Sequence, residues 1–129
     1  MTRRIALIDD EVDVATYLAT ALEDNGYEVH TRTDTAGLVE FLEELTPDVI
    51  CLDLVMPGRT GVSLYETLCR HPRLKDVPVV IITGLAADEG VRRLLVDPAP
   101  AAYLDKPVDL DRLLEVVDRA APERVEVSQ

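Results

Sequence analysis

Short apolar runs alternate with amphipathic stretches along the whole chain. The apolar runs lie at 4–8, 28–31, 48–52, 77–83 and 101–104, and each has the length of a β-strand. The first, third and fourth runs are continuous rather than alternating, which is typical of parallel strands that are covered on both faces. The pattern therefore predicts five strands in a largely buried parallel sheet.

The stretch after the first run has the spacing of an amphipathic helix. Apolar residues recur there every three or four positions and form one stripe: Val14, Tyr17, Leu18, Ala21 and Leu22. Asn25-Gly26 is predicted to end this helix, because glycine readily adopts the left-handed conformation that follows a helix end.

Further helices are predicted at 38–45, 62–70 and 87–96, and a fifth begins after the N-cap residue Asp109. Strands and helices therefore alternate five times, which requires right-handed crossovers and a parallel sheet. The expected fold class is α/β, a doubly wound five-stranded parallel sheet of order 2-1-3-4-5 with five helices, flavodoxin-like. In such sheets ligands bind beyond the carboxyl ends of the strands, here between strands one and three.

Polar residues stand where the strands beside this crevice end. Asp9-Asp10 follow the first strand, Asp53 follows the third, Thr83 ends the fourth, and Lys106 follows the fifth. The residues before them are apolar. Because the carboxyl ends of parallel strands meet at one edge, we expect these side chains to converge.

Three carboxylates close together need a counter-charge. Two carboxylates about 4 Å apart repel by about 4 kcal/mol at an effective dielectric constant of about 20. Mg²⁺ relieves this repulsion and prefers oxygen ligands, and no histidine or cysteine belongs to the group, which argues against zinc. We therefore expect Asp9, Asp10 and Asp53 to bind Mg²⁺.

Lys106 supplies a second positive charge at this edge. The chain contains eleven arginines and only two lysines, so a lysine after the fifth strand indicates that a compact ammonium is required. With oxygen charge neutralised by Mg²⁺ and Lys106, and with Thr83 donating a hydrogen bond, Asp53 is equipped as a nucleophile toward phosphorus. The product would be an aspartyl phosphate.

These motifs, in this order and spacing, resemble the receiver domain of two-component response regulators. The matching segments are LIDDE, DVICLDLVMPGRTG, PVVIITG and YLDKP, and the similarity extends over residues 3–121. The resemblance implies a signalling switch rather than an enzyme, with only self-phosphorylation from small donors and slow self-dephosphorylation. The implied partners are a sensor histidine kinase or a histidine phosphotransfer protein, an unknown output protein, and a second copy if phosphorylation drives dimerisation of the monomer.

The resemblance also implies individual roles at the metal and phosphorylation site. Asp53 is the phosphoacceptor, Asp10 is a direct Mg²⁺ ligand, and Asp9 acts through water or hydrogen bonds. The backbone carbonyl of Val55 completes the protein ligands. Glu11 is interpreted as a first-turn acid favoured by the helix dipole, with an indirect metal role as the alternative.

The same resemblance implies a switch. Thr83 and Lys106 contact the phosphoryl group, and Tyr103 is the aromatic residue of strand five that turns inward on activation. The surface formed by helix four, strand five and helix five then changes. The Lys106–Pro107 peptide is expected to be cis.

The sequence departs from the family pattern in three ways. Thr60 replaces a common aspartate, and Pro98 and Pro100 stiffen the connection before strand five. Val55 and Leu85 flank the phosphoryl site with apolar side chains that cannot orient a hydrolytic water, so we expect slow loss of the phosphoryl group.

Composition excludes several other functions. A formal charge of −12 and a pI near 4.4 disfavour direct binding of nucleic acid or of an anionic membrane. The first apolar run is too short for a signal peptide, and no run approaches the ~18 residues of a membrane span. Cys51 and Cys69 lack CxxC partners and are read as reduced, packed residues, so a cytoplasmic location is expected.

The expected organisation is one receiver domain at 1–121 and a flexible tail at 122–129. A stand-alone regulator and a receiver from a longer chain both remain open. One rival function is a Mg²⁺-dependent phosphohydrolase of the haloacid dehalogenase type, but its nucleophile follows strand one in a DxD pattern. Another is a receiver-like interaction module that is never phosphorylated, but such a module would lack catalytic groups.

Overall fold

The computed structural model of this chain describes residues 2–54, 61–84, 89–95 and 98–121. The described strands form one parallel sheet in the order β2-β1-β3-β4-β5. This confirms the predicted fold class and strand order. The strands are β1 (Arg4–Ile8), β2 (Glu28–Arg32), β3 (Val49–Leu52), β4 (Val79–Thr83) and β5 (Ala102–Asp105).

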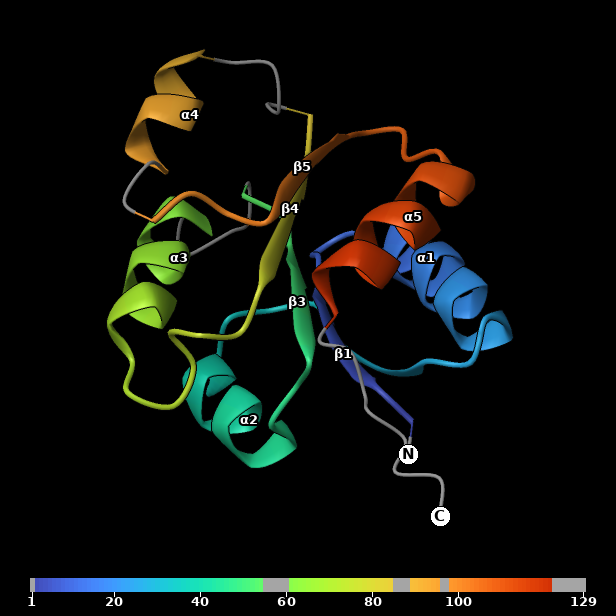
Figure 1. Ribbon diagram of the computed structural model, residues 1–129, viewed down its shortest axis with the longest axis horizontal. Coiled ribbons are helices and arrows are strands. Elements are labelled where there is room, and N and C mark those ends of the chain that lie inside the picture. The colour runs from blue at the N-terminus through green and yellow to red at the C-terminus, as the bar shows by residue number, and fades with distance from the viewer. Residues whose placement is uncertain (1, 55–60, 85–88, 96–97, 122–129) are drawn as a thin grey trace.

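Helices cover both faces of the sheet (Figure 1). The first and last lie on one face, and the second and third lie on the other, each over its own apolar cluster. The strands β1, β3 and β4 are buried almost throughout, because they run between the two helical layers. The helices are α1 (Val12–Asp24), α2 (Leu38–Leu45), α3 (Gly61–Arg70), α4 (Glu89–Leu94) and α5 (Leu110–Ala120).

The predicted helix ends agree with the structure at two positions. Gly26 follows α1 with φ of 91°, a conformation that glycine adopts without the strain of a side chain. Asp109 caps α5, because its side chain accepts hydrogen bonds from the backbone N–H groups of Asp111 and Arg112.

Some predicted details were wrong. The strand β4 begins at Val79 rather than at 77, because Val77 donates its N–H to Leu74 in a turn and Pro78 has no N–H to donate. The helix α4 ends at Leu94, before the predicted limit of 96.

The buried face of α1 is also rotated from the predicted stripe. Its buried residues are Ala15, Leu18, Ala19 and Leu22, whereas Tyr17 is 56% exposed. Two alanines let the helix backbone lie close to the sheet, and the larger Tyr17 side chain then falls on the solvent side.

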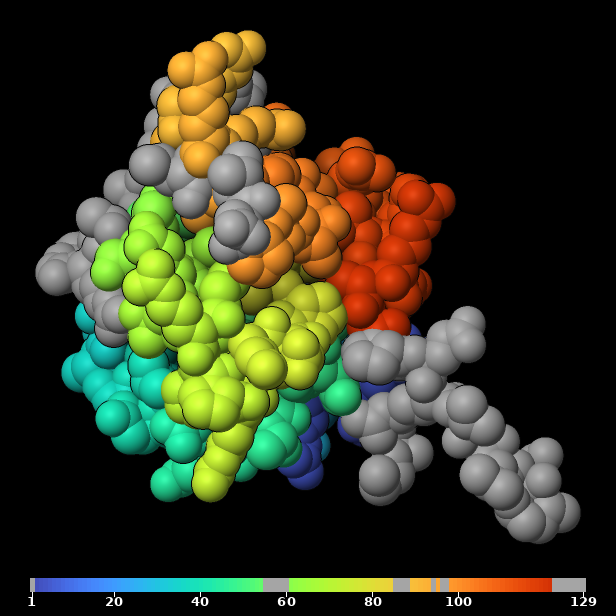
Figure 2. Space-filling view, turned by 60° about the vertical axis from the view of Figure 1, so that its left-hand side comes forward, coloured from blue at the N-terminus to red at the C-terminus, as the bar shows by residue number. Residues whose placement is uncertain are grey.

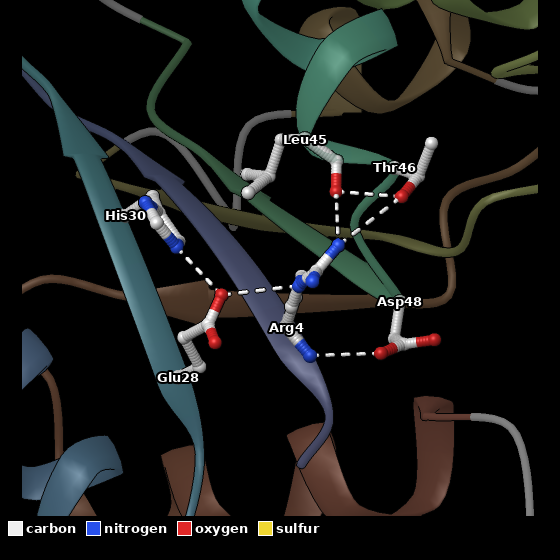
Figure 3. A network of polar contacts seen from close by, with 6 residues as sticks. All are labelled: Arg4, Glu28, His30, Leu45, Thr46 and Asp48. Atoms are coloured by element: carbon white, nitrogen blue, oxygen red, sulfur yellow. Dashed lines mark hydrogen bonds and ion pairs between the residues drawn. The ribbon is translucent and has the colours of Figure 1, made fainter. Parts of the chain in front are cut away.

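Polar contacts join the elements at the amino edge of the sheet, opposite Asp53 (Figure 3). The backbone N–H of Arg4 donates to Asp48 Oδ2 at 2.7 Å, and its Nη1 donates to the Leu45 carbonyl at 3.1 Å. Glu28 Oε2 lies 3.1 Å from Arg4 Nε and 2.8 Å from His30 Nε2. The network ties β1, β2 and the connection between α2 and β3 together.

Two further sequence predictions concern membrane-spanning helices and the C-terminal tail. Within the described ranges, no helix has both the length and the apolar character needed to cross a membrane. The predicted tail at 122–129 lies outside the described residues.

Candidate functional site

The carboxyl ends of β1 and β3 bring four acidic side chains together. Asp53 follows β3, and its backbone N–H donates to the Ile8 carbonyl at the end of β1 at 2.9 Å. Asp9, Asp10, Glu11 and Asp53 each offer a carboxylate oxygen, and all four oxygens lie within 4.8 Å of one another. The predicted acidic trio therefore converges, and Glu11 joins it.

Two of these carboxylates are withdrawn from water. Asp9 is 1% exposed and Asp53 is 4% exposed. Asp9 Oδ1 accepts a hydrogen bond from the Glu11 backbone N–H at 3.0 Å. Asp9 Oδ2 is buried and accepts no hydrogen bond from any residue within the described ranges.

Lys106 lies among the carboxylates. Its Nζ donates to Glu11 Oε1 at 2.8 Å and to Asp53 Oδ2 at 3.0 Å. It also lies 2.8 Å from Asp9 Oδ2, an ion pair in an orientation outside hydrogen-bond geometry. Burial acts to lower the pKa of Lys106, but the contacts of its ammonium with the carboxylates of Asp9, Glu11 and Asp53 outweigh burial and leave the pKa raised. The ammonium is therefore firmly charged at neutral pH.

Backbone contacts hold Lys106 beside the end of β4. Its N–H donates to the Thr83 carbonyl at 3.2 Å, and the following peptide, Lys106–Pro107, is cis as expected. Thr83 is fully buried at the carboxyl end of β4, where its hydroxyl was predicted to contact a phosphoryl group. Among the described residues, the predicted site residues Asp9, Asp10, Asp53, Thr83 and Lys106 all lie at or directly after the carboxyl ends of their strands.

Tyr103 lies on β5, where it pairs with Ile81 of the neighbouring strand β4, two residues before Thr83. Its ring packs against the cluster formed by α2 and α3, and its hydroxyl donates to the Leu95 carbonyl at 3.5 Å. The guanidinium of Arg92 covers the ring, with Cζ 4.4 Å from the centroid. The aromatic residue predicted as a switch therefore contacts α4 directly.

Three residues named in the sequence analysis lie outside the described residues. They are Val55, whose carbonyl was expected to bind Mg²⁺, Leu85, which was expected to flank the phosphoryl group, and Thr60, which departs from the family pattern in a loop. The functions of Val55 and Leu85 stay predictions.

Comparison with known proteins agrees with this geometry. The family model of the response regulator receiver domain matches residues 5–118. The chain belongs to this family. The receiver domain is 35% identical over 120 residues to protein Rrf1 of Nitratidesulfovibrio vulgaris, covering 93% of this chain and 83% of Rrf1.

A second relative is longer than this receiver domain. The phosphate regulon transcriptional regulatory protein PhoB of Escherichia coli is 32% identical to it over 130 residues, which cover 98% of this chain and 56% of PhoB. The receiver domain thus spans about half the length of PhoB. Functions of the whole PhoB protein therefore do not transfer with the match.

Solved structures agree on the fold. The chemotaxis protein CheY4 of Vibrio cholerae has a TM-score of 0.84 at 24% identity, covering 93% of this chain and 99% of CheY4. The receiver domain of Francisella response regulator 1452 has a TM-score of 0.81 at 26% identity, covering 92% of this chain and 96% of that one. The first likeness concerns the fold alone.

The donor set of this receiver domain fits a hard divalent cation. The side chains that converge here offer only carboxylate oxygens, which suit Mg²⁺ rather than zinc. The buried Asp9 Oδ2 already lies 2.8 Å from the Lys106 ammonium but accepts no hydrogen bond from a described residue, so it remains available to a metal cation. The formal net charge of the four carboxylates and the Lys106 ammonium is −3.

The sequence interpretation missed the contact of Glu11. Glu11 is the N-cap residue of α1, but its side chain makes no capping hydrogen bond and instead reaches Lys106. One signal was present: Ser, Thr, Asp and Asn are the preferred N-cap residues, and glutamate is not among them.

Proposed function

We propose that this receiver domain accepts a phosphoryl group on Asp53 in the presence of Mg²⁺, and that this changes the surface formed by α4, β5 and α5. The observation that carries the proposal is the position of Asp53, which lies 3.0 Å from an ammonium within a group of carboxylates. A carboxylate held beside fixed positive charge is suited to attack phosphorus, because the charge that develops on the phosphoryl oxygens is stabilised.

The chemical step is a phosphoryl transfer with a balanced set of bonds. An Asp53 carboxylate oxygen forms a bond to phosphorus while the bond from phosphorus to the donor breaks, and the donor leaves with the electron pair. Lys106 then holds a phosphoryl oxygen where it held Asp53 Oδ2. Thr83, at the end of β4, donates its hydroxyl to another phosphoryl oxygen.

Asp9, Asp10 and Asp53 are the proposed ligands of Mg²⁺, with the carbonyl of Val55 as a further expected ligand. When bound, the ion neutralises negative charge on the transferring phosphoryl group. The excess of acidic charge in the site and the buried Asp9 Oδ2 support this assignment.

The surface beside the site supports a protein as the physiological donor. Val12 and Tyr17 on α1 are 61% and 56% exposed. A groove of about 460 Å³ runs between α1 and the segment after β5, and Glu11 and Lys106 border it. A sensor histidine kinase or a histidine phosphotransfer protein could dock here with its phosphohistidine over Asp53. A cytoplasmic location stays a prediction.

The proposed output passes through Tyr103 to α4. Thr83 moves toward the phosphoryl group, and Tyr103 occupies the space that opens. To move a two-state population from 1:99 to 99:1, phosphorylation must favour the active state by about 5.5 kcal/mol. The contact of Tyr103 with Arg92, and the exposed position of α4 at the periphery (Figure 2), support this route.

Incubation with acetyl phosphate and Mg²⁺, followed by intact-mass and peptide mapping, tests the function. We expect one phosphoryl group, on the peptide that contains Asp53, and none without Mg²⁺. Asp53→Asn should abolish the label, whereas Asp105→Asn, a matched change of an exposed acid at the end of β5, should retain it. Labelling of Asp53→Asn at the normal level, or steady turnover of p-nitrophenyl phosphate, would contradict a receiver function.

A further inference from the structure

The Glu11 side chain neither caps α1 nor packs in the core. It occupies the N-cap position of α1, where its backbone carbonyl accepts from Ala15 at 2.9 Å, but its side chain makes no capping hydrogen bond. That side chain is 58% exposed and forms a 2.8 Å ion pair with Lys106. The two residues are 95 positions apart, so the pair links the start of α1 to the segment after β5.

The partners of Lys106 differ in what phosphorylation does to them. An ammonium has three N–H donors, and two of them bond to Glu11 and Asp53. When Asp53 becomes an acyl phosphate, its bonded oxygen loses the charge that attracts Lys106. Asp9, which is buried, is a proposed metal ligand. Glu11 is the other hydrogen-bonded partner of Lys106. It stays a carboxylate after phosphorylation, and it is not a proposed metal ligand.

We propose that Glu11 is the positioning residue of Lys106: it holds the ammonium at the mouth of the site while Lys106 exchanges Asp53 for an incoming phosphoryl oxygen. This inference rests on the proposed function of Asp53. Glu11 does not contact the phosphorus, and it gains and loses no covalent bond in the transfer. It acts by keeping Lys106 in place, so that less motion of the ammonium is needed in the transition state.

The test compares Glu11→Gln with Asp13→Asn in the full chain. Both remove one negative charge at the start of α1, and Asp13 is exposed in the first turn of the same helix. With acetyl phosphate and Mg²⁺, we expect the rate constant for Asp53 phosphorylation to fall about two- to fivefold in Glu11→Gln, as for loss of one partly exposed ion pair. Asp13→Asn should stay within about a factor of 1.5 of the wild type, as a surface change away from the site.

A second readout observes Lys106 without metal or donor. The chain contains only two lysines, Lys75 and Lys106, so a lysine-labelled sample has two side-chain ammonium resonances that Lys106→Arg assigns. An ammonium held in ion pairs exchanges its protons slowly. In Glu11→Gln, we expect faster proton exchange at Lys106 and no change at Lys75, whereas Asp13→Asn should leave both unchanged.

Glu11→Asp separates positioning from helix stability. Aspartate is a preferred N-cap residue, so α1 should be as stable as in the wild type or more so. Its side chain is shorter by one C–C bond, about 1.5 Å, and should not maintain the contact with Lys106. We therefore expect Glu11→Asp to show the slow phosphorylation and fast Lys106 exchange of Glu11→Gln together with an undiminished melting temperature.

Each outcome decides the inference. Slower phosphorylation with faster Lys106 exchange in both Glu11 variants supports it. An unchanged or increased phosphorylation rate in Glu11→Gln overturns it, and so does slow phosphorylation with unchanged Lys106 exchange. If the wild type takes up no phosphoryl group, the proposed function fails, and the exchange measurement alone decides whether Glu11 holds Lys106.

Discussion

The guanidinium of Arg92 lies over the ring of Tyr103, with Cζ 4.4 Å from the ring centroid. Arg92 belongs to α4 and Tyr103 to β5, so a side chain of the proposed output surface covers the residue proposed to sense phosphorylation. Such a cation–π contact contributes about 0.5–1 kcal/mol at an exposed site. The contact therefore couples the position of the ring to the position of α4.

Removing the Arg92 charge should change the titration of Tyr103. Burial raises the pKa of the Tyr103 phenol, and the positive charge of Arg92 opposes that rise. In Arg92→Gln, we expect the pKa of Tyr103 to rise further. Ultraviolet titration of tyrosinate, with Tyr103→Phe to assign the transition, measures this. Arg93→Gln is the control, because that side chain is 82% exposed and its ion-pair partner is Glu89. An equal shift of the Tyr103 pKa in both variants would mean that the net charge of α4, and not the contact with the ring, is responsible.

Lys106 should be essential for stability when Mg²⁺ is absent. Its removal leaves the buried carboxylates of Asp9 and Asp53 without their nearest positive charge. We expect Lys106→Ala to lower the free energy of unfolding by about 3 kcal/mol, as for a broken buried ion pair. Mg²⁺ should restore part of the loss by neutralising the same carboxylates. Urea unfolding with EDTA and with millimolar Mg²⁺ measures both effects.

The double variant Lys106→Ala/Asp53→Asn distinguishes uncompensated charge from lost packing. Neutralising Asp53 removes one of the repelling carboxylates, so the double variant should be more stable than Lys106→Ala without metal. Equal stabilities would mean that packing of the lysine stem, and not its charge, accounts for the loss.

A glycine at the start of α3 allows the close approach of the chain that carries Asp53. A Cβ on Gly61 would lie 2.3 Å from Leu54 Cα and 2.6 Å from the Asp53 carbonyl oxygen. Both are backbone atoms, so relief of the clash must shift the backbone at Leu54 and Asp53 or at the start of α3. We expect Gly61→Ala to lower the free energy of unfolding by about 2 kcal/mol or more and to slow phosphorylation. Gly84→Ala is the matched control, since a Cβ there meets no atom of the described residues within 4 Å.

The fold could be predicted from the sequence because buried segments have a recognisable pattern of apolar residues. Continuous apolar runs marked the central strands, and β1 and α2 were predicted with the limits that the structure has. The start of β4 was missed because Val77 is apolar like the strand that follows, and only its hydrogen bond to Leu74 shows that it belongs to a turn. The exposure of Tyr17 was missed because apolar periodicity does not report how closely a helix approaches the sheet.

The site was predictable where strand ends determine it. Parallel strands bring Asp9 and Asp53 to one edge whatever their loops do, so their meeting followed from the strand order. The contact of Glu11 with Lys106 depends on the path of the chain after β5, and no local pattern encodes a pair 95 residues apart. The direction of side chains at loop positions therefore could not be predicted from the sequence.

Tyr27 should make stability depend on alkaline pH. It is buried beside α5, and its hydroxyl donates to Asp118 Oδ1. Burial, the hydrogen bond to Asp118 and the charge of Asp118 raise the pKa of Tyr27 from 10.0 to about 12. Because the pKa is higher in the folded than in the unfolded state, the stabilisation is fully present below pH 10 and is lost as the pH rises through about 12.

Comparison of the wild type with Tyr27→Phe isolates this effect. At pH 8, we expect Tyr27→Phe to be less stable by about 1 kcal/mol through the lost hydrogen bond. Between pH 10 and 12 the difference should shrink, because the wild type alone loses the contribution of Tyr27. Urea unfolding at a series of pH values measures it, with Tyr17→Phe as an exposed control. A stability difference that stays constant up to pH 12 would show that the Tyr27 phenol does not titrate differently in the folded and unfolded chains.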